Sequence, residues 1–435
     1  MKIEFQIEGY WWLPENPDNR IAGIFYYKPN EDSDLKLFGD FDSNQDFISK
    51  HFVSETEPPL IILGEDENAN KITLTILGYG NKNYNFLSSF PLIHYIIRYC
   101  IKGIHLASKD ANIFNEIKVE LESLTSWMNF YPVRLSIPIK DNKPTRGFAL
   151  SYSQTEENLS FIINDGFELS VNALATCTDI HKEEIVVRQK HIVSIKSTEA
   201  SNFLTLLDKS YRLQSFLNMA TFNHNDFLAL RLYSDQHFQE LEDKKRFPTT
   251  IELFFKQMSK GRIDRKSPKI REYLFTYSDV KDIFPELIKK WFTFDKKMMP
   301  ILRHLIDSIE QKTDFKSIDF LIVVQALEGY HHRFFDQEPE KEKNLKSRLR
   351  NVKNFFSKDI LIIREIDTDY TANSRNYYSH FYNKSADIQI AEGADLYHLT
   401  NKLRYLLICC FLHELGLEKV KINNILQTYT ERLLL

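Results

Sequence analysis

The apolar residues change their spacing about two thirds of the way along the chain, and this change limits the fold more than any other feature. At residues 3–7 isoleucine and phenylalanine alternate with polar side chains, which is the period of a strand with one buried face. At residues 396–410 leucines and a cysteine recur at steps of three and four, which is the period of a helix. The sequence therefore predicts an α+β protein, with a β-rich N-terminal region followed by an all-α bundle.

The first part of the chain repeats the strand pattern many times. Clusters of turn-forming residues at 14–19 and 30–34 separate the first runs. Short strands at this spacing are typical of an antiparallel sandwich or barrel. The runs that we interpret as strands are Ile21–Lys28, Leu35–Gly39, Leu60–Leu63, Ile72–Leu77, Ile117–Thr125, Val133–Ile139, Phe148–Ser153, Leu159–Ile163, Phe167–Ala175 and Ile185–Ile195.

The pattern becomes mixed after Ser197. Residues 198–222 have the spacing of a helix, and residues 228–233 that of one more strand. The stretch 244–282 is rich in lysine and arginine and contains two prolines, so we interpret it as a linker between domains. These observations predict one domain over residues 1–285 and a second over 286–435.

The last third has a helical pattern throughout. We expect helices around residues 302–309, at 318–335, at 341–356, at 396–410 and at 423–433, with Gly416 as a C-cap. Helices of this length with short connections form a four- or five-helix bundle.

Composition excludes several classes of protein. The net charge of −4 provides no overall attraction for a polyanion, so any nucleic-acid contact must come from a local patch. The four cysteines form no regular framework, and no stretch approaches the length of a membrane span. We therefore expect a soluble cytoplasmic protein that needs no cofactor. Cys177, His181 and His191 lack the spacing of a structural zinc site, so no metal is expected either.

One short motif carries the elements of a chemical site. Arg375 and Asn376 are followed after three residues by His380. On a helix Asn376 and His380 share a face, and the long Arg375 side chain can bend toward them. An imidazole that moves protons and a guanidinium that clamps phosphate are what metal-free RNA cleavage requires. The same spacing also fits a surface arginine and a core histidine on an ordinary helix.

Two basic stretches are further candidates for RNA contact. Lys346, Arg350 and Lys353 step by four and three, so they form a stripe on one side of a helix that could follow a phosphate backbone. A solvated helix face explains the same stripe. The stretch 244–269 has phenylalanines among its basic residues, and a folded linker is the simpler interpretation.

The motif Arg375–His380, late in an all-helical region, resembles the HEPN ribonuclease signature. The segment Ala326–Phe335 resembles the second helix of the ApeA-type HEPN domain, and Gly9–Pro14 with Leu37–Gly39 resembles the opening of the ApeA N-terminal domain. Trp11 and Trp12 within that opening could bind a ligand or belong to the core. Residues 90–290 carry no motif that we recognise.

The resemblance implies an antiphage protein that acts by abortive infection, with a HEPN domain that cuts RNA such as transfer RNA. It implies a homodimer through the HEPN domain, Arg375, Asn376 and His380 as site residues, and a phage-derived trigger. Glu328 could support the site, or simply pair with a nearby cation. Two alternatives remain. In the first, a HEPN bundle binds RNA, a nucleotide or a protein without cutting. In the second, the β domain binds carbohydrate or protein and the bundle only dimerises it.

Overall fold

A computed structural model of the chain divides into two compact units. The first unit comprises Met1–Leu124, Tyr131–Tyr211 and Asp226–Lys266, and the second comprises Thr125–Phe130, Arg212–Asn225 and Ser267–Leu435. The domain boundary near residue 285 stays a prediction. The described residues are 1–41, 58–83, 91–140, 143–144, 147–153, 159–164, 166–178, 186–240, 246–257, 269–294, 296–310, 317–335, 344–381 and 388–434.

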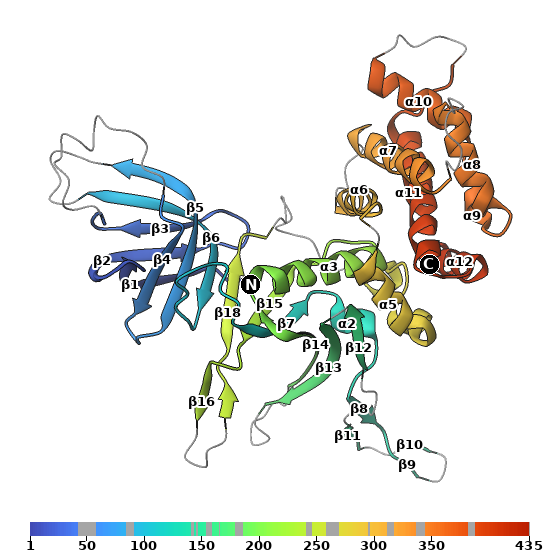
Figure 1. The fold of residues 1–435 in the computed structure, drawn as a ribbon. Helices are drawn as coiled ribbons and strands as arrows, with labels where there is room; N and C mark the ends of the chain where they lie inside the picture. The colour runs from blue at the N-terminus through green and yellow to red at the C-terminus, as the bar shows by residue number, and fades with distance from the viewer. Residues whose placement is uncertain are drawn as a thin grey trace. The chain divides into compact units, whose positions relative to one another are not determined.

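The first unit is built on a twelve-stranded sheet, which confirms the β-rich N-terminal region (Figure 1). The strands follow the order β12-β13-β14-β7-β15-β18-β6-β3-β2-β1-β4-β5, and every adjacent pair is antiparallel. Their bounds are β1 Phe5–Leu13, β2 Asn16–Tyr27, β3 Ser33–Leu37, β4 Ile61–Asp66, β5 Lys71–Asn83, β6 Leu92–Lys102, β7 Phe114–Leu121, β12 Leu159–Asn164, β13 Phe167–Cys177, β14 Val187–Ser201, β15 Phe227–Tyr233 and β18 Ile251–Phe255.

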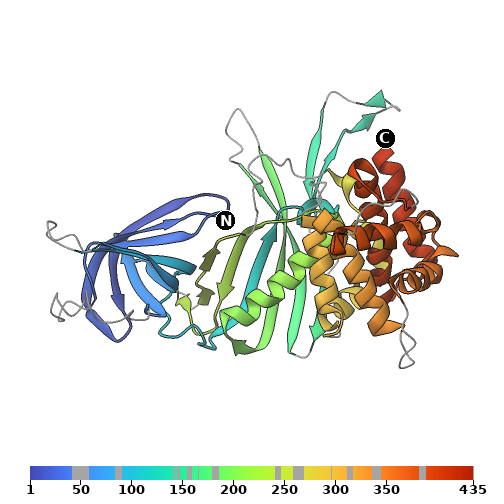
Figure 2. The same ribbon diagram turned by 90° about the horizontal axis from the view of Figure 1, so that it is seen from above.

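Strand β6 closes six of these strands into a barrel. One of its edges pairs with β5 along its whole length, from Leu92 to Lys102. Its other edge is divided, because residues 93–97 pair with β3 and residues 99–102 pair with β18. The strands β1 to β6 thus form a closed barrel, and β18 continues the sheet outward (Figure 2).

Trp11 fills the centre of the barrel and is fully buried. The ring lies on Gly64, where an added Cβ would lie 2.3 Å from the indole. Trp12 is also buried and packs on Ile61 and Leu63. Both tryptophans therefore belong to the core, which was the alternative to ligand binding in the sequence analysis.

One sequence interpretation of this unit needs correction, and one strand was missed. The stretch 244–282 is not simply a linker, because β18 pairs with β15 on one side and with β6 on the other. The sequence analysis also did not identify β6, the strand on which the barrel closes. The remaining strands form three separate two-stranded sheets, with bounds β8 Val133–Ser136, β9 Ile139–Lys140, β10 Lys143–Pro144, β11 Ala149–Tyr152, β16 Phe238–Glu240 and β17 Arg246–Pro248.

The second unit is helical, as the sequence predicts. In its described part, short helices precede a bundle that begins at α6. Helix α3 contributes residues to both units. The bounds are α2 Leu124–Met128, α3 Phe203–Thr221, η1 Ile270–Glu272, α4 Tyr277–Val280, η2 Lys281–Ile283, α5 Phe284–Thr293, α6 Met299–Glu310, α7 Ser317–Phe334, α8 Leu345–Ser357, α9 Leu361–Arg364, α10 Thr368–His380, α11 Gly393–Glu414 and α12 Lys419–Leu434.

A buried ionic group connects three helices of the bundle. Arg404 of α11 donates from Nη2 to Asp319 of α7 and from Nε to Ser308 of α6, the latter over 2.6 Å. The side chains of Arg404 and Asp319 are 1% and 5% exposed, so each charge depends on the other.

Helix α11 ends as the sequence predicts. Gly416 has a φ of +94° and donates to the carbonyl of His413, while Leu417 donates to that of Leu412. This pair of bonds is the Schellman arrangement. Within the residues described, no helix is both long and apolar enough to cross a membrane.

Candidate active site

Helix α10 presents the Arg375–His380 motif. Asp367 caps its N-terminus by accepting hydrogen bonds from the backbone of Asp369 and Tyr370. The opposite end stops at Phe381, which has a left-handed conformation and is 87% exposed. Ser374 is buried and accepts a 2.9 Å hydrogen bond from the backbone of Ala391, so the face that carries it points inward. The neighbouring positions of the motif consequently lie at the accessible side of the helix.

The three motif residues meet at one place. Nη1 of Arg375 lies 3.2 Å from Nε2 of His380 and 3.3 Å from Oδ1 of Asn376. The arginine side chain bends along the helix to make both contacts, as we expected from its length. His380 is exposed at the last turn, and the Arg375 side chain is 30% exposed. A substrate can therefore reach both groups.

The contact between arginine and histidine assigns a role to one imidazole nitrogen. A guanidinium only donates hydrogen bonds, so Nε2 of His380 is the acceptor in this contact. A neutral imidazole with an acceptor nitrogen beside a permanent cation can remove a proton from a hydroxyl group while the cation holds an adjacent anion.

A carboxylate on the neighbouring helix α7 holds the arginine in place. Oε2 of Glu328 lies 4.0 Å from Nη2 of Arg375, and Oε1 accepts a 2.7 Å hydrogen bond from Arg348 of α8. Glu328 thus bridges two cations, so it is both a neighbour of the motif and an ion-pair partner. Sequence reasoning did not single out Arg348. Its position in the helical repeat could have identified it, because residue 348 lies on the opposite side of α8 from 346, 350 and 353.

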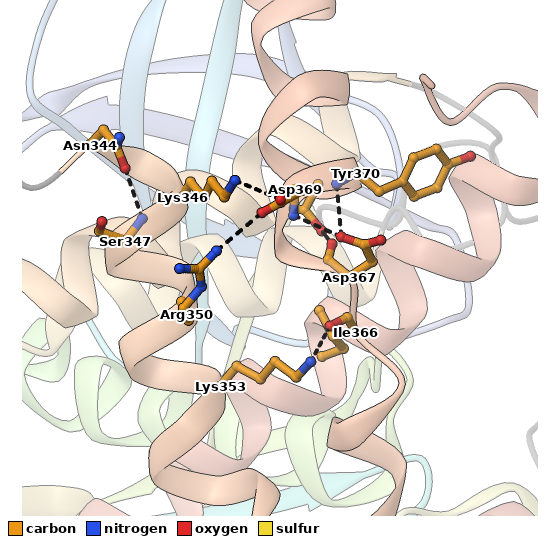
Figure 3. Close-up of polar contacts among 10 residues, drawn as sticks. Asn344, Lys346, Ser347, Arg350, Lys353, Ile366, Asp367, Asp369 and Tyr370 are labelled. Atoms are coloured by element: carbon orange, nitrogen blue, oxygen red, sulfur yellow. Dashed lines mark hydrogen bonds and ion pairs between the residues drawn. The ribbon is translucent and has the colours of Figure 1, made fainter. Parts of the chain in front are cut away.

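The basic stripe of α8 faces the first turn of α10 (Figure 3). Lys346 and Arg350 both pair with Asp369, at 2.6 and 3.5 Å, and Lys353 donates to the carbonyl of Ile366. The ion pair with Lys346, with a smaller contribution from Arg350, lowers the pKa of the Asp369 carboxyl. The stripe therefore attaches α8 to α10, with Lys346 and Arg350 still 42% and 52% exposed.

The other candidate groups belong to elements other than α7, α8 and α10. Cys409 and Cys410 are buried in α11, and burial raises the pKa of both thiols. Cys177 and His191 lie on the paired strands β13 and β14, while His181 lies outside the described residues. Over the residues that the structure describes, no three His, Cys, Asp or Glu side chains are grouped as metal ligands would be.

Comparison with known protein families agrees with this architecture. The family model of ApeA N-terminal domain 1 matches residues 6–291, which is well over half of the chain. The chain belongs to the ApeA family. The model of the Apea-like HEPN domain matches residues 321–421, a segment that contains Glu328, Arg375 and His380. No curated protein sequence matches the chain.

The two matches confirm the arrangement that the resemblance implied. An ApeA-type N-terminal domain precedes a C-terminal HEPN domain, the architecture of an antiphage HEPN effector. The HEPN match begins within α7 and ends within α12, so α10 and its motif lie well inside it.

Proposed function

We propose that this ApeA-family protein is a metal-independent endoribonuclease and that Arg375 and His380 carry the reaction. The observation that supports the proposal most is the 3.2 Å contact between Arg375 Nη1 and His380 Nε2 at an accessible helix end. A cation and an imidazole are held together there, on the domain whose family generally cuts RNA.

The reaction follows from the roles of the two side chains. A phosphodiester takes the place of His380 beside the Arg375 guanidinium, which frees Nε2. Nε2 removes the proton of the ribose 2′-hydroxyl, the 2′-oxygen bonds to phosphorus, and the bond from phosphorus to the 5′-oxygen breaks. The products are a 2′,3′-cyclic phosphate and a 5′-hydroxyl, whose oxygen needs one proton. Arg375 stabilises the charge that gathers on the phosphate oxygens.

A single motif histidine in each chain, His380, favours a paired site. The reaction needs a base and an acid at the same time, and His380 can serve as only one of them. In a homodimer through the HEPN domains, His380 of a second copy acts in its protonated, imidazolium form and gives that proton to the 5′-oxygen. Asn376 donates to the phosphate, and Glu328 holds Arg375 until the substrate arrives.

The biological role that we attach to this activity is abortive infection. A phage-derived trigger acts through the N-terminal region, and the released nuclease cuts RNA, with transfer RNA as the expected substrate, in the cytoplasm. Lys346 and Arg350 contribute to RNA binding with their exposed portions, and Lys353 extends the stripe.

The second candidate is a HEPN module that binds RNA, a nucleotide or a protein without cutting. One observation favours it: Lys346, Arg348 and Arg350 of α8 already pair with carboxylates on α10 or α7, so these charges are balanced without a substrate. Such a module would bind RNA equally well with or without His380.

A digest of transfer RNA in EDTA separates the two candidates. The wild-type chain is compared with His380→Ala and with His398→Ala, which removes another exposed histidine of the same domain. The nuclease proposal expects fragments with cyclic phosphate ends from the wild type and the His398 variant only. The digest is repeated in extract of infected cells, which supplies a trigger. Cleavage that survives in His380→Ala, or its absence from all proteins in that extract, contradicts the proposal.

A further inference from the structure

The β8–β11 hairpin has an apolar face in open solvent. Leu135 of β8 pairs directly with Leu150 of β11, and Tyr152 lies two residues further along the same face. These three side chains are 66%, 47% and 58% exposed. The positions between them hold Arg134, Ser136, Ala149 and Ser151, so the apolar residues gather on one side.

The apolar surface continues toward the tip of the hairpin. Ile137, Ile139 and Phe148 are 56%, 73% and 69% exposed. In both ribbon views the strands β8 and β11 project away from the large sheet of their unit (Figures 1 and 2). At its base, the backbone of Val133 donates a 2.8 Å hydrogen bond to the side chain of Gln189.

A hairpin of this kind is not stable alone. A two-stranded sheet in water is marginal unless a further strand or another layer covers its apolar side. Six large side chains at about half to three quarters exposure leave on the order of 600 Å² of apolar surface, at the upper end of the patches found on monomers. The patch is therefore a contact surface.

We propose that a second copy of this chain covers the face, so that two hairpins pack face to face about a twofold axis. The area supports this occupant, because roughly 600 Å² on each copy approaches the ~800 Å² per partner of a standard interface. A direct cross-strand pair such as Leu135 and Leu150 can meet its own copy about a twofold axis, which is the requirement of an isologous contact.

This contact is separate from the HEPN pairing of the proposed nuclease and does not depend on any activity. It lies in the first unit, in strands that the HEPN match does not include. For a nuclease, two chains already joined at the hairpin would hold their remaining surfaces at a high effective concentration, which favours pairing of the HEPN domains.

Sedimentation of the full-length protein over a concentration series tests the contact. The variant Leu135→Thr/Leu150→Thr keeps a β-branched pair on the strands but removes the apolar area. Its matched control is Ser136→Thr/Ser151→Thr, on the opposite face. We expect a wild-type species of two 51.5 kDa chains, or of four where the HEPN domains pair as well, a dissociation constant for the hairpin contact at least tenfold weaker in the leucine variant, and no change in the control.

Cross-linking gives an independent readout. Cys177 is the only exposed cysteine of the four, so Cys177→Ser provides a background without reactive thiols. Leu150→Cys in this background should give covalent dimers with a short bis-maleimide, and Ser151→Cys should give few. A monomeric wild type, an unchanged dissociation constant in the leucine variant, or equal cross-linking of the two cysteines overturns the proposal, and a different protein would then be the occupant.

Discussion

Glu328 on α7 and Arg375 on α10 lie 4.0 Å apart, and the same carboxylate accepts a 2.7 Å hydrogen bond from Arg348 on α8. This one side chain therefore links three helices at the HEPN motif. Because Arg375 also contacts His380, the position of the imidazole depends indirectly on a residue 52 positions earlier in the chain.

Glu328→Gln should slow RNA cleavage without preventing RNA binding. The amide keeps the size of the side chain but loses the charge that holds Arg375, and a misplaced catalytic group costs roughly 10- to 100-fold in rate. Single-turnover cleavage and binding are measured separately, with Glu365→Gln as the control, since the ion pair of Glu365 is with Lys402 of α11. An equal loss of cleavage and of binding would argue for a structural role of Glu328 instead.

Asp319→Ala should destabilise the helical unit by about 3–5 kcal/mol, because it leaves the charge of Arg404 buried without its partner. The double variant Asp319→Leu/Arg404→Met should recover most of this loss. Chemical unfolding followed by far-ultraviolet circular dichroism checks both, as most helices lie in the second unit. A double variant as unstable as the single one would mean that hydrogen bonds to Ser308, not the charge, matter most.

Gly64→Ala should destabilise the barrel by about 2 kcal/mol, since its Cβ would lie 2.3 Å from the ring of Trp11 and the core must shift. Gly78→Ala is the matched control on the same barrel, because a Cβ there meets nothing within 4 Å. Denaturant unfolding followed by tryptophan fluorescence compares the two. Equal effects at both positions would show that backbone entropy, and not the contact with Trp11, explains the loss.

The first unit should lose stability as the pH falls below 6.5. Burial lowers the pKa of His191 to about 4, so the folded state holds the imidazole neutral while the unfolded chain takes up a proton near 6.5. The stabilising contribution is complete above pH 6.5 and decreases toward pH 4, with roughly 2 kcal/mol lost between pH 7 and pH 5. Unfolding at these two pH values measures it. His191→Phe should remove this part of the pH dependence, and a variant that keeps the full dependence would contradict the assignment to His191.

The sequence was most informative where a short period repeats. The three-four spacing along α11 predicts a face that the structure buries. The alternation at residues 3–7 predicts a half-buried strand that the structure shows only from Phe5 onward, with Ile7 buried and Ile3 81% exposed. Gly416 could be placed because a helix end that needs a positive φ favours glycine. The proximity of Arg375 to His380 follows from their separation on one helix, which sequence spacing determines directly.

Long-range pairing explains what the sequence could not predict. No local pattern shows which strands pair with β6, because its two edges pair with three strands from other parts of the chain. β18 was hidden in a basic stretch that resembles a linker. The bridge from Glu328 to Arg348 also depends on how α7 meets α8, which no local pattern encodes.

The closed barrel has a consequence for the order in which the protein is made. All its strands come from β1 to β6, so the chain that forms them is complete at Lys102, while His380 is added 278 residues later. At roughly 5–20 residues per second on a ribosome, this interval lasts about 14–56 seconds. The barrel thus has time to fold during translation, before a cell holds any chain with a complete histidine motif.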